Sequence, residues 1–116
     1  MAKSATPDLL GSFEQLVLLA VVRLRDDAYG MTVRREISDR ARREVSLGAV
    51  YATLDRLERK GFVASNSGSS GAARGGRARR FFEIRAKGRT ALQHTLETLD
   101  HCREGLSGLE PSGATS

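Results

Sequence analysis

Four arginines stand within seven residues of the chain, and two adjacent glycines separate the first two: Arg74, Arg77, Arg79 and Arg80. A guanidinium group can bind two phosphate oxygens at once. The cluster is therefore suited to hold the phosphates of a nucleic acid. The other interpretation is a solvated, flexible loop, and the surrounding elements have to distinguish the two.

Residues that could support catalysis, a cofactor or a metal are few. The glycine-rich stretch 71–76 leads into an expected strand and lacks the Lys-Ser/Thr pair of a phosphate-binding loop. His94 and His101 are seven residues apart on an expected helix, about 10 Å along its axis, which is too far for one ion. Cys102, beside them, suits a small interface residue better than a redox switch. We therefore predict no enzyme activity, no cofactor and no metal.

Length and charge favour a single domain that binds a polyanion. The chain has 116 residues, a net charge of +5 and a pI near 10.1. Residues 74–89 carry +6, from seven basic residues and one acid, whereas residues 90–116 carry −3. One cysteine excludes an internal disulfide, and neither a signal peptide nor a membrane span is evident. These features predict a cytoplasmic protein with one surface for an anion and another for a different partner.

Periodicity and turn signals predict a mainly helical fold with one small β-hairpin. A capping box at Ser12 and Gln15 would begin the first helix, and Ser46 would cap the third. Val50, Leu54 and Leu57 form the buried face of the third helix, and Gly61 follows at its end. The expected helices span residues 12–25, 31–43, 47–60 and 86–106, and the expected strands span 62–65 and 79–84, with a flexible loop at 66–78.

Three helices followed by a basic hairpin are the element order of a winged helix-turn-helix. Small residues on the exposed start of the third helix would let it approach the floor of the DNA major groove. Tyr51 would either contact DNA or pack locally, and Asp55 would either pair with Arg59 or lie outside the groove. The predicted DNA-binding residues are Ser46, Gly48, Ala49, Tyr51, Ala52, Arg74, Arg77, Arg79 and Arg80.

An ordered set of motifs resembles the PadR family of bacterial transcriptional regulators. The motifs are Leu10-Gly11-Ser12, Tyr29-Gly30, the run from Gly48 to Leu54 with Leu57, Glu58 and Gly61, then Gly76-Arg77, the run from Arg80 to Ile84, and Gly88-Arg89. The likeness covers roughly residues 9–106. The family usually has proline at Ala52, tyrosines at Phe81 and Phe82, and threonine at Arg85. Loss of that threonine removes a cap for the last helix, which could then begin elsewhere.

The resemblance implies a homodimer that binds a palindromic operator, usually as a repressor, and in some members releases DNA on binding a small molecule. It also implies pairing through the last helix with help from the first. The first helix is apolar on nearly every side, which itself favours a partner subunit. The predicted seam on the last helix comprises Leu92, Leu96, Leu99 and Leu106.

We expect a DNA-binding domain at 9–85, a dimerisation helix at 86–106, and flexible tails at 1–8 and 107–116. Two alternatives remain at this point. One is a winged-helix module that binds RNA or a protein, and the other is a regulator from a different winged-helix family.

Overall fold

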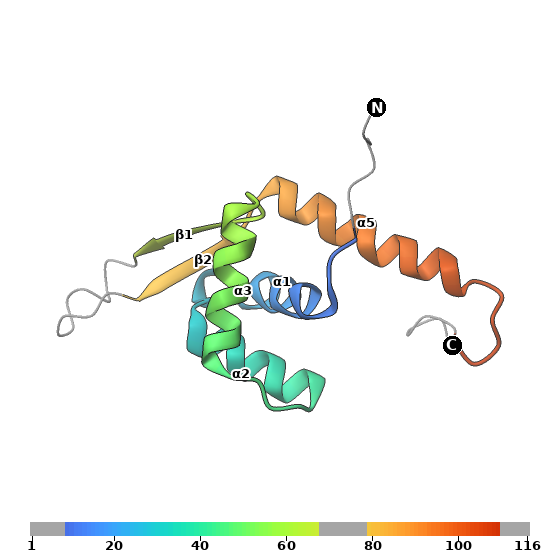
Figure 1. The fold of residues 1–116 in the computed structure, drawn as a ribbon, viewed down its shortest axis with the longest axis horizontal. Coiled ribbons are helices and arrows are strands. Elements are labelled where there is room, and N and C mark those ends of the chain that lie inside the picture. Colours follow the sequence, from blue (N-terminus) through green and yellow to red (C-terminus); the bar gives the residue numbers. More distant parts are fainter. Residues whose placement is uncertain (1–8, 68–78, 110–116) are drawn as a thin grey trace.

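The computed structural model describes residues 9–67 and 79–109. The elements follow the predicted order (Figure 1): α1 (Ser12–Leu24), η1 (Arg25–Asp27), α2 (Gly30–Ala41), α3 (Leu47–Arg59), β1 (Val63–Ser67), β2 (Arg80–Ile84) and α5 (Ala86–Arg103). None of the helices in these two ranges is both long enough and apolar enough to cross a bilayer. The fold is a winged helix-turn-helix with one further helix, as the sequence predicts.

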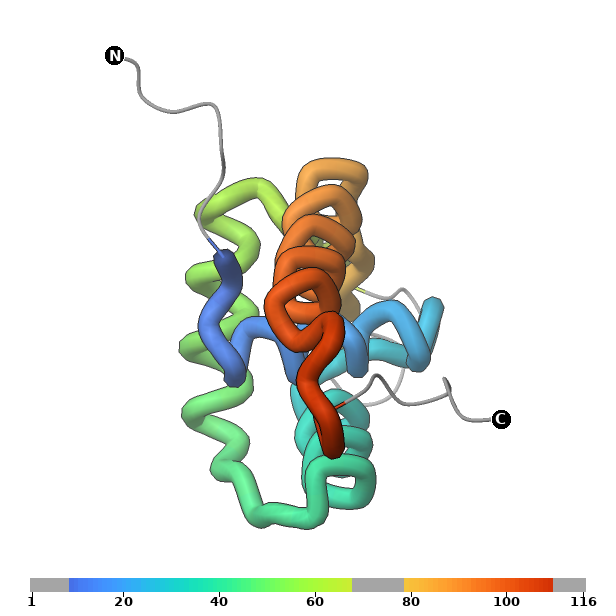
Figure 2. The backbone as a smooth tube through the Cα atoms, turned by 90° about the vertical axis from the view of Figure 1, so that its right-hand side faces the viewer, coloured from blue at the N-terminus to red at the C-terminus, as the bar shows by residue number. Residues whose placement is uncertain are grey.

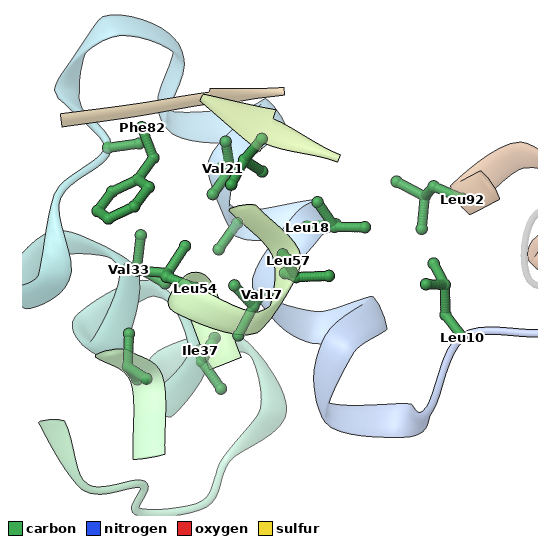
Figure 3. Packing of buried hydrophobic residues seen from close by; sticks show 14 of the residues in the cluster. Leu10, Val17, Leu18, Val21, Val33, Ile37, Leu54, Leu57, Phe82 and Leu92 are labelled. Atoms are coloured by element: carbon green, nitrogen blue, oxygen red, sulfur yellow. The ribbon is translucent and has the colours of Figure 1, made fainter. Parts of the chain in front are cut away.

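The core forms where α1, α2, α3 and the hairpin meet. The predicted face of α3 is fully buried, since Val50, Leu54 and Leu57 have no exposed surface. They pack with Val17, Leu18 and Val21 of α1, Val33 and Ile37 of α2, and Phe82 of β2 (Figure 3). Met31, near the start of α2, is exposed and lies outside this core.

Local signals at the helix ends are partly confirmed. The Ser46 hydroxyl accepts a hydrogen bond from the Ala49 amide at 3.0 Å, and Gly61 has the left-handed φ of +82°. The predicted capping box at Ser12 is wrong by one residue. Gly11 is the N-cap of α1, and its amide donates to Glu14 Oε1 at 3.1 Å. The capping-box pattern favours Ser12, because glycine has no side-chain acceptor, but only the bond from the Gly11 amide to Glu14 forms here.

The hairpin is an antiparallel pair in which Val63 lies opposite Ile84 and Ser67 lies opposite Arg80. A bridge between Tyr29 and Phe81 and a hydrogen bond from the Phe82 amide to the Ala28 carbonyl at 2.8 Å attach it to the start of α2. The predicted loop at 66–78 therefore begins later than expected, because residues 66 and 67 still belong to β1. The rest of that loop, with Arg74 and Arg77, lies outside the described residues.

Helix α5 runs outward from the body on the side away from the hairpin (Figures 1 and 2). It begins at Ala86, as predicted, although Arg85 offers no side-chain cap. It ends at Arg103, three residues before the predicted end, and Gly105 follows with a φ of +79°. Leu106 therefore does not lie on the helix as expected, and its place in the dimer interface stays a prediction.

Candidate nucleic-acid interface

The first two turns of α3 present a small, exposed face. Gly48, Ala49 and Ala52 are all exposed, and their spacing places them on one side of the helix. A Cβ atom at Gly48 would meet no atom of the described chain within 4 Å. The capping hydroxyl of Ser46 lies at the start of this face. A helix with no bulk on one side can bring its backbone close to a groove floor.

Tyr51 is half-buried and lies over the first residue of α2. An ideal Cβ built on Gly30 would come within 2.4 Å of both Cζ and the hydroxyl oxygen of Tyr51. Gly30 is therefore the residue that makes room for the tyrosine ring. Of the two sequence-based interpretations, local packing is what the structure shows, and a contact with DNA stays a prediction. The Gly30–Tyr51 contact was not anticipated from the sequence, since the two residues are 21 positions apart.

The two arginines at the start of β2 have different environments. The exposed Arg79 lies over the Tyr29 ring, with 4.6 Å between its guanidinium carbon and the ring centroid. Arg80 instead reaches α3, where Nη1 donates to Asp55 Oδ1 at 2.9 Å and Nη2 donates to Glu58 Oε1 at 2.6 Å. The predicted Asp55–Arg59 pair is thus replaced by a pair with Arg80.

The alternation of side chains along the predicted strand could have indicated the orientation of Arg80. Side chains alternate along a strand, so Arg80 shares a face with Phe82, which is buried. A residue on that face points toward the body of the protein. The number of charges in this segment does not by itself show which face each arginine occupies.

The second half of α3 is also attached to α1 by charge. The side chain of Glu14, only 10% exposed, accepts from Arg56 Nε at 3.3 Å and from Lys60 Nζ at 2.9 Å. Burial acts to raise the pKa of Glu14, but hydrogen bonds from Lys60, Gly11 and Arg56, together with the charge of Lys60, lower it overall. Arg56 of α3 and Lys60, which caps its C-terminal end, are therefore engaged within the fold.

The predicted interface leucines of α5 fall into two groups. Leu92 is only 6% exposed and packs in the core, facing Leu10 at one end of the cluster (Figure 3). Its burial therefore needs no partner chain. Leu96 and Leu99 are 37% and 43% exposed, whereas Leu106 is exposed beyond the helix end. Leu19 of α1 is exposed as well in the single chain, and its coverage by a partner subunit stays a prediction.

His94, His101 and Cys102 do not combine with other residues into a metal site. Within residues 9–67 and 79–109, no three or more His, Cys, Asp or Glu side chains form a group that could hold an ion. His101 lies 3.5 Å from a carboxylate oxygen of Glu104 and is exposed.

Comparison with known proteins identifies the family. Residues 18–94 match the model of the transcriptional regulator PadR-like family, which is more than half of the chain. No match was found among curated proteins.

Several solved structures share the fold. A PadR-like transcription factor from Bacteroides fragilis is 20% identical with a TM-score of 0.69, covering 79% of this chain and 84% of its own. A PadR family regulator from Clostridium difficile R20291 is 17% identical, with a TM-score of 0.64 and coverages of 79% and 92%. RosR of H. salinarum, an archaeal protein, is 23% identical, with a TM-score of 0.64 and coverages of 83% and 79%. The fold is therefore not confined to bacteria.

Proposed function

Because the chain belongs to the PadR-like family of transcriptional regulators, we propose that it is a repressor that binds a palindromic operator as a homodimer. The family consists of regulators and not of enzymes. In this proposal the start of α3 enters the major groove, the hairpin (the wing) lies along the neighbouring backbone, and α5 pairs with its copy. Action on operator DNA is consistent with the cytoplasmic location predicted from the sequence.

The observation that carries the proposal is the small exposed face at the start of α3. Gly48, Ala49 and Ala52 leave the helix backbone accessible, and the Ser46 cap sets where the helix begins. The free amides at a helix N-terminus carry partial positive charge, which favours a phosphate nearby. This face of α3 could therefore approach the base edges while the helix N-terminus binds a phosphate of the DNA backbone.

The wing contributes attraction to phosphates. Arg79 is exposed beside the described end of the hairpin, and its stacking on Tyr29 holds the guanidinium without using its hydrogen-bond donors. Arg74 and Arg77 remain predicted phosphate contacts. Phosphates are the same at every base step, so contacts with them carry no sequence information. We therefore propose that the wing contributes to affinity and that α3 determines sequence preference.

Self-association is supported by the apolar surface that a single chain leaves uncovered. Leu96 and Leu99 are exposed on α5, three residues apart and therefore on the same side of the helix. Burying each leucine contributes about 2 kcal/mol. Two copies joined in this way would present two α3 helices to the two half-sites of a palindrome.

The deciding experiment compares Gly48→Glu with Gly48→Ala in binding to duplexes that wild type enriches from a random pool. Glutamate adds bulk and negative charge to the proposed groove face, so we expect affinity to fall more than about 100-fold, whereas alanine should stay close to wild type. Fluorescence anisotropy gives the affinities, and circular dichroism confirms folding. A folded Gly48→Glu protein that binds as tightly as wild type would show that this helix does not enter the groove.

The dimer is tested separately with Leu99→Asp, and Leu106→Asp serves as the matched control beyond the helix end. A charge in the apolar seam should give monomer in light scattering, and the control should remain dimeric. Retention of the dimer in Leu99→Asp would exclude this seam.

A further inference from the structure

The side chain of Arg80 is held by protein groups on all three of its guanidinium nitrogens. Besides the bonds to Asp55 and Glu58, Nε donates to Ser65 Oγ at 3.3 Å. The guanidinium carbon also lies 4.9 Å from the centroid of the Phe82 ring. These bonds use three of the five N–H donors of the guanidinium, so a phosphate at Arg80 would have to share the group with two carboxylates that repel it.

Ser65 and Glu58 close the arrangement into a network across three elements. The Ser65 hydroxyl donates to Glu58 Oε2 at 2.7 Å, so that one carboxylate of α3 binds both β1 and β2. The hydrogen bond from Ser65 lowers the pKa of Glu58, burial opposes this, and Arg80 lowers the pKa further. The carboxylate is therefore charged at neutral pH and able to hold both strands.

The neighbouring Arg79 shows what a wing arginine without this network does. Both arginines are exposed, but Arg79 stacks on the Tyr29 ring, whereas Arg80 is hydrogen-bonded to Asp55, Glu58 and Ser65. Adjacent residues in an extended segment point to opposite sides, so Arg79 and Arg80 face different surroundings despite their identical chemistry. The hydrogen-bond donors of Arg80 are therefore engaged by protein acceptors, and those of Arg79, just before β2, are not used by its stacking contact.

The charges of Asp55 and Glu58 give the network a second effect. Both acids stand on α3, the helix that we propose to place in the groove, where uncompensated carboxylates repel phosphate. Arg80 offsets part of this charge while it attaches the hairpin. Loss of Arg80 would therefore both release the wing and expose two acids to the DNA.

We propose that Arg80 is a positioning residue that fixes the wing relative to α3, and that it is not one of the phosphate contacts. The network of Arg80, Asp55, Glu58 and Ser65 is called the wing latch below. The inference revises the sequence-based expectation for Arg80, and its consequence for DNA rests on the proposed function.

The first part of the test uses the protein without DNA. Hydrogen–deuterium exchange is measured on wild type, Arg80→Gln and the matched control Arg79→Gln. Arg80→Gln should raise amide exchange in β1 and β2 by about threefold to tenfold, because local opening is no longer opposed by the latch. Arg79→Gln should leave these rates unchanged. Equal rates in all three proteins would overturn the latch.

The second part is a double-mutant cycle with Arg80→Glu, Glu58→Arg and the combination, titrated with random-sequence duplex of about 30 base pairs, long enough for two half-sites. The combination restores an ion pair of reversed polarity between wing and helix. A positioning role predicts that Glu58→Arg raises affinity at least about threefold more in the Arg80→Glu background than in wild type.

If Arg80 bound phosphate directly, the new arginine would add the same factor in both backgrounds, and this additivity would overturn the proposal. Failure of every variant and of wild type to bind duplex would refute the proposed function instead. In that case the exchange rates would still decide whether Arg80 fixes the wing.

Discussion

The two halves of α3 differ in what their exposed side chains contact. The first two turns carry Gly48, Ala49 and Ala52, which are small and exposed. The last two turns carry Asp55 and Glu58, which bind the wing, and Arg56, which binds Glu14 of α1, as does Lys60 directly after the helix. One half is left accessible, and the other is fixed to the rest of the protein.

This division shows that the number of charges on a helix does not give the number of contacts with a ligand. The charged half of α3 would attract attention in any inspection of a basic protein, but Asp55 and Glu58 pair with Arg80 and Arg56 pairs with Glu14. The half with almost no functional groups is the one whose backbone a groove can approach. Interaction with DNA then depends on where α1 and the wing hold this helix.

Tyr51 is the one large polar side chain in the first two turns of α3, and its replacement should give the largest change in stability. Tyr51→Ala removes the half-buried ring that fills the space above Gly30. We expect this change to lower the free energy of unfolding by about 2 kcal/mol. Urea denaturation measures the change. Tyr51→Phe keeps the ring and should match wild type in stability.

The same phenylalanine variant separates packing from recognition. If Tyr51→Phe retains stability and loses DNA affinity, the hydroxyl contacts DNA, as the sequence analysis favoured. If it retains both, the ring is a packing residue only, and the first half of α3 reads DNA without it.

Glu14 binds the C-terminal end of α3, and its contribution to the stability of the protein should depend on pH. Its pKa in the folded protein lies below the ordinary value of 4.5, so its contribution is fully present above that value and is lost as the pH falls through the folded pKa. Glu14→Gln should therefore lower the free energy of unfolding by about 1.5 kcal/mol at pH 7. This difference from wild type should become smaller as the pH falls toward 3.

The control is Glu97→Gln, because Glu97 is an exposed residue of α5. We expect no change in the free energy of unfolding for this variant at either pH. Urea denaturation at the two pH values provides the comparison. A constant difference between Glu14→Gln and wild type from pH 7 to pH 3 would show that the charge of Glu14 is not what stabilises this end of α3.

Sequence periodicity could predict the faces of the elements but not their partners. The spacing of Val50, Leu54 and Leu57 determines which side of α3 is buried, and the cap at Ser46 is a local pattern. The wing latch joins residues 15 or more positions apart, except for the contact between Ser65 and Glu58. Such pairs depend on how the hairpin packs on the helix, which no local pattern in this chain records.

Periodicity also could not predict which residues cover the leucines of α5. A spacing of four and three residues groups Leu92 with Leu96 and Leu99, although Leu92 packs against Leu10 at the other end of the chain. The amide of Leu10 also donates to the buried Thr95 hydroxyl at 3.1 Å. A segment just before the first helix thus covers part of the stripe that the sequence assigned to a partner.

Removal of the Ser46 cap should have a smaller effect, confined to the accessible half. Ser46→Ala loses the hydrogen bond from the Ala49 amide, which should destabilise the protein by about 1 kcal/mol. Ser12→Ala is the matched control, because Ser12 lies just inside α1 and Gly11 is the cap there. Thermal unfolding of both variants distinguishes them, and an equal loss in each would mean that the cap at Ser46 adds nothing specific.

The smallest effect on stability is expected for Arg79→Ala, which should instead change the salt dependence of DNA binding. The side chain is exposed, so we expect less than about 0.5 kcal/mol of change in unfolding. Each phosphate contact that is lost lowers the slope of log affinity against log salt by about 1, equally for operator and random duplex. Arg103→Ala, at the far end of α5, removes the same charge and should leave the slope unchanged. A change in operator preference at constant slope would mean that Arg79 contacts base edges, and the accessible half of α3 would then share sequence reading with the wing.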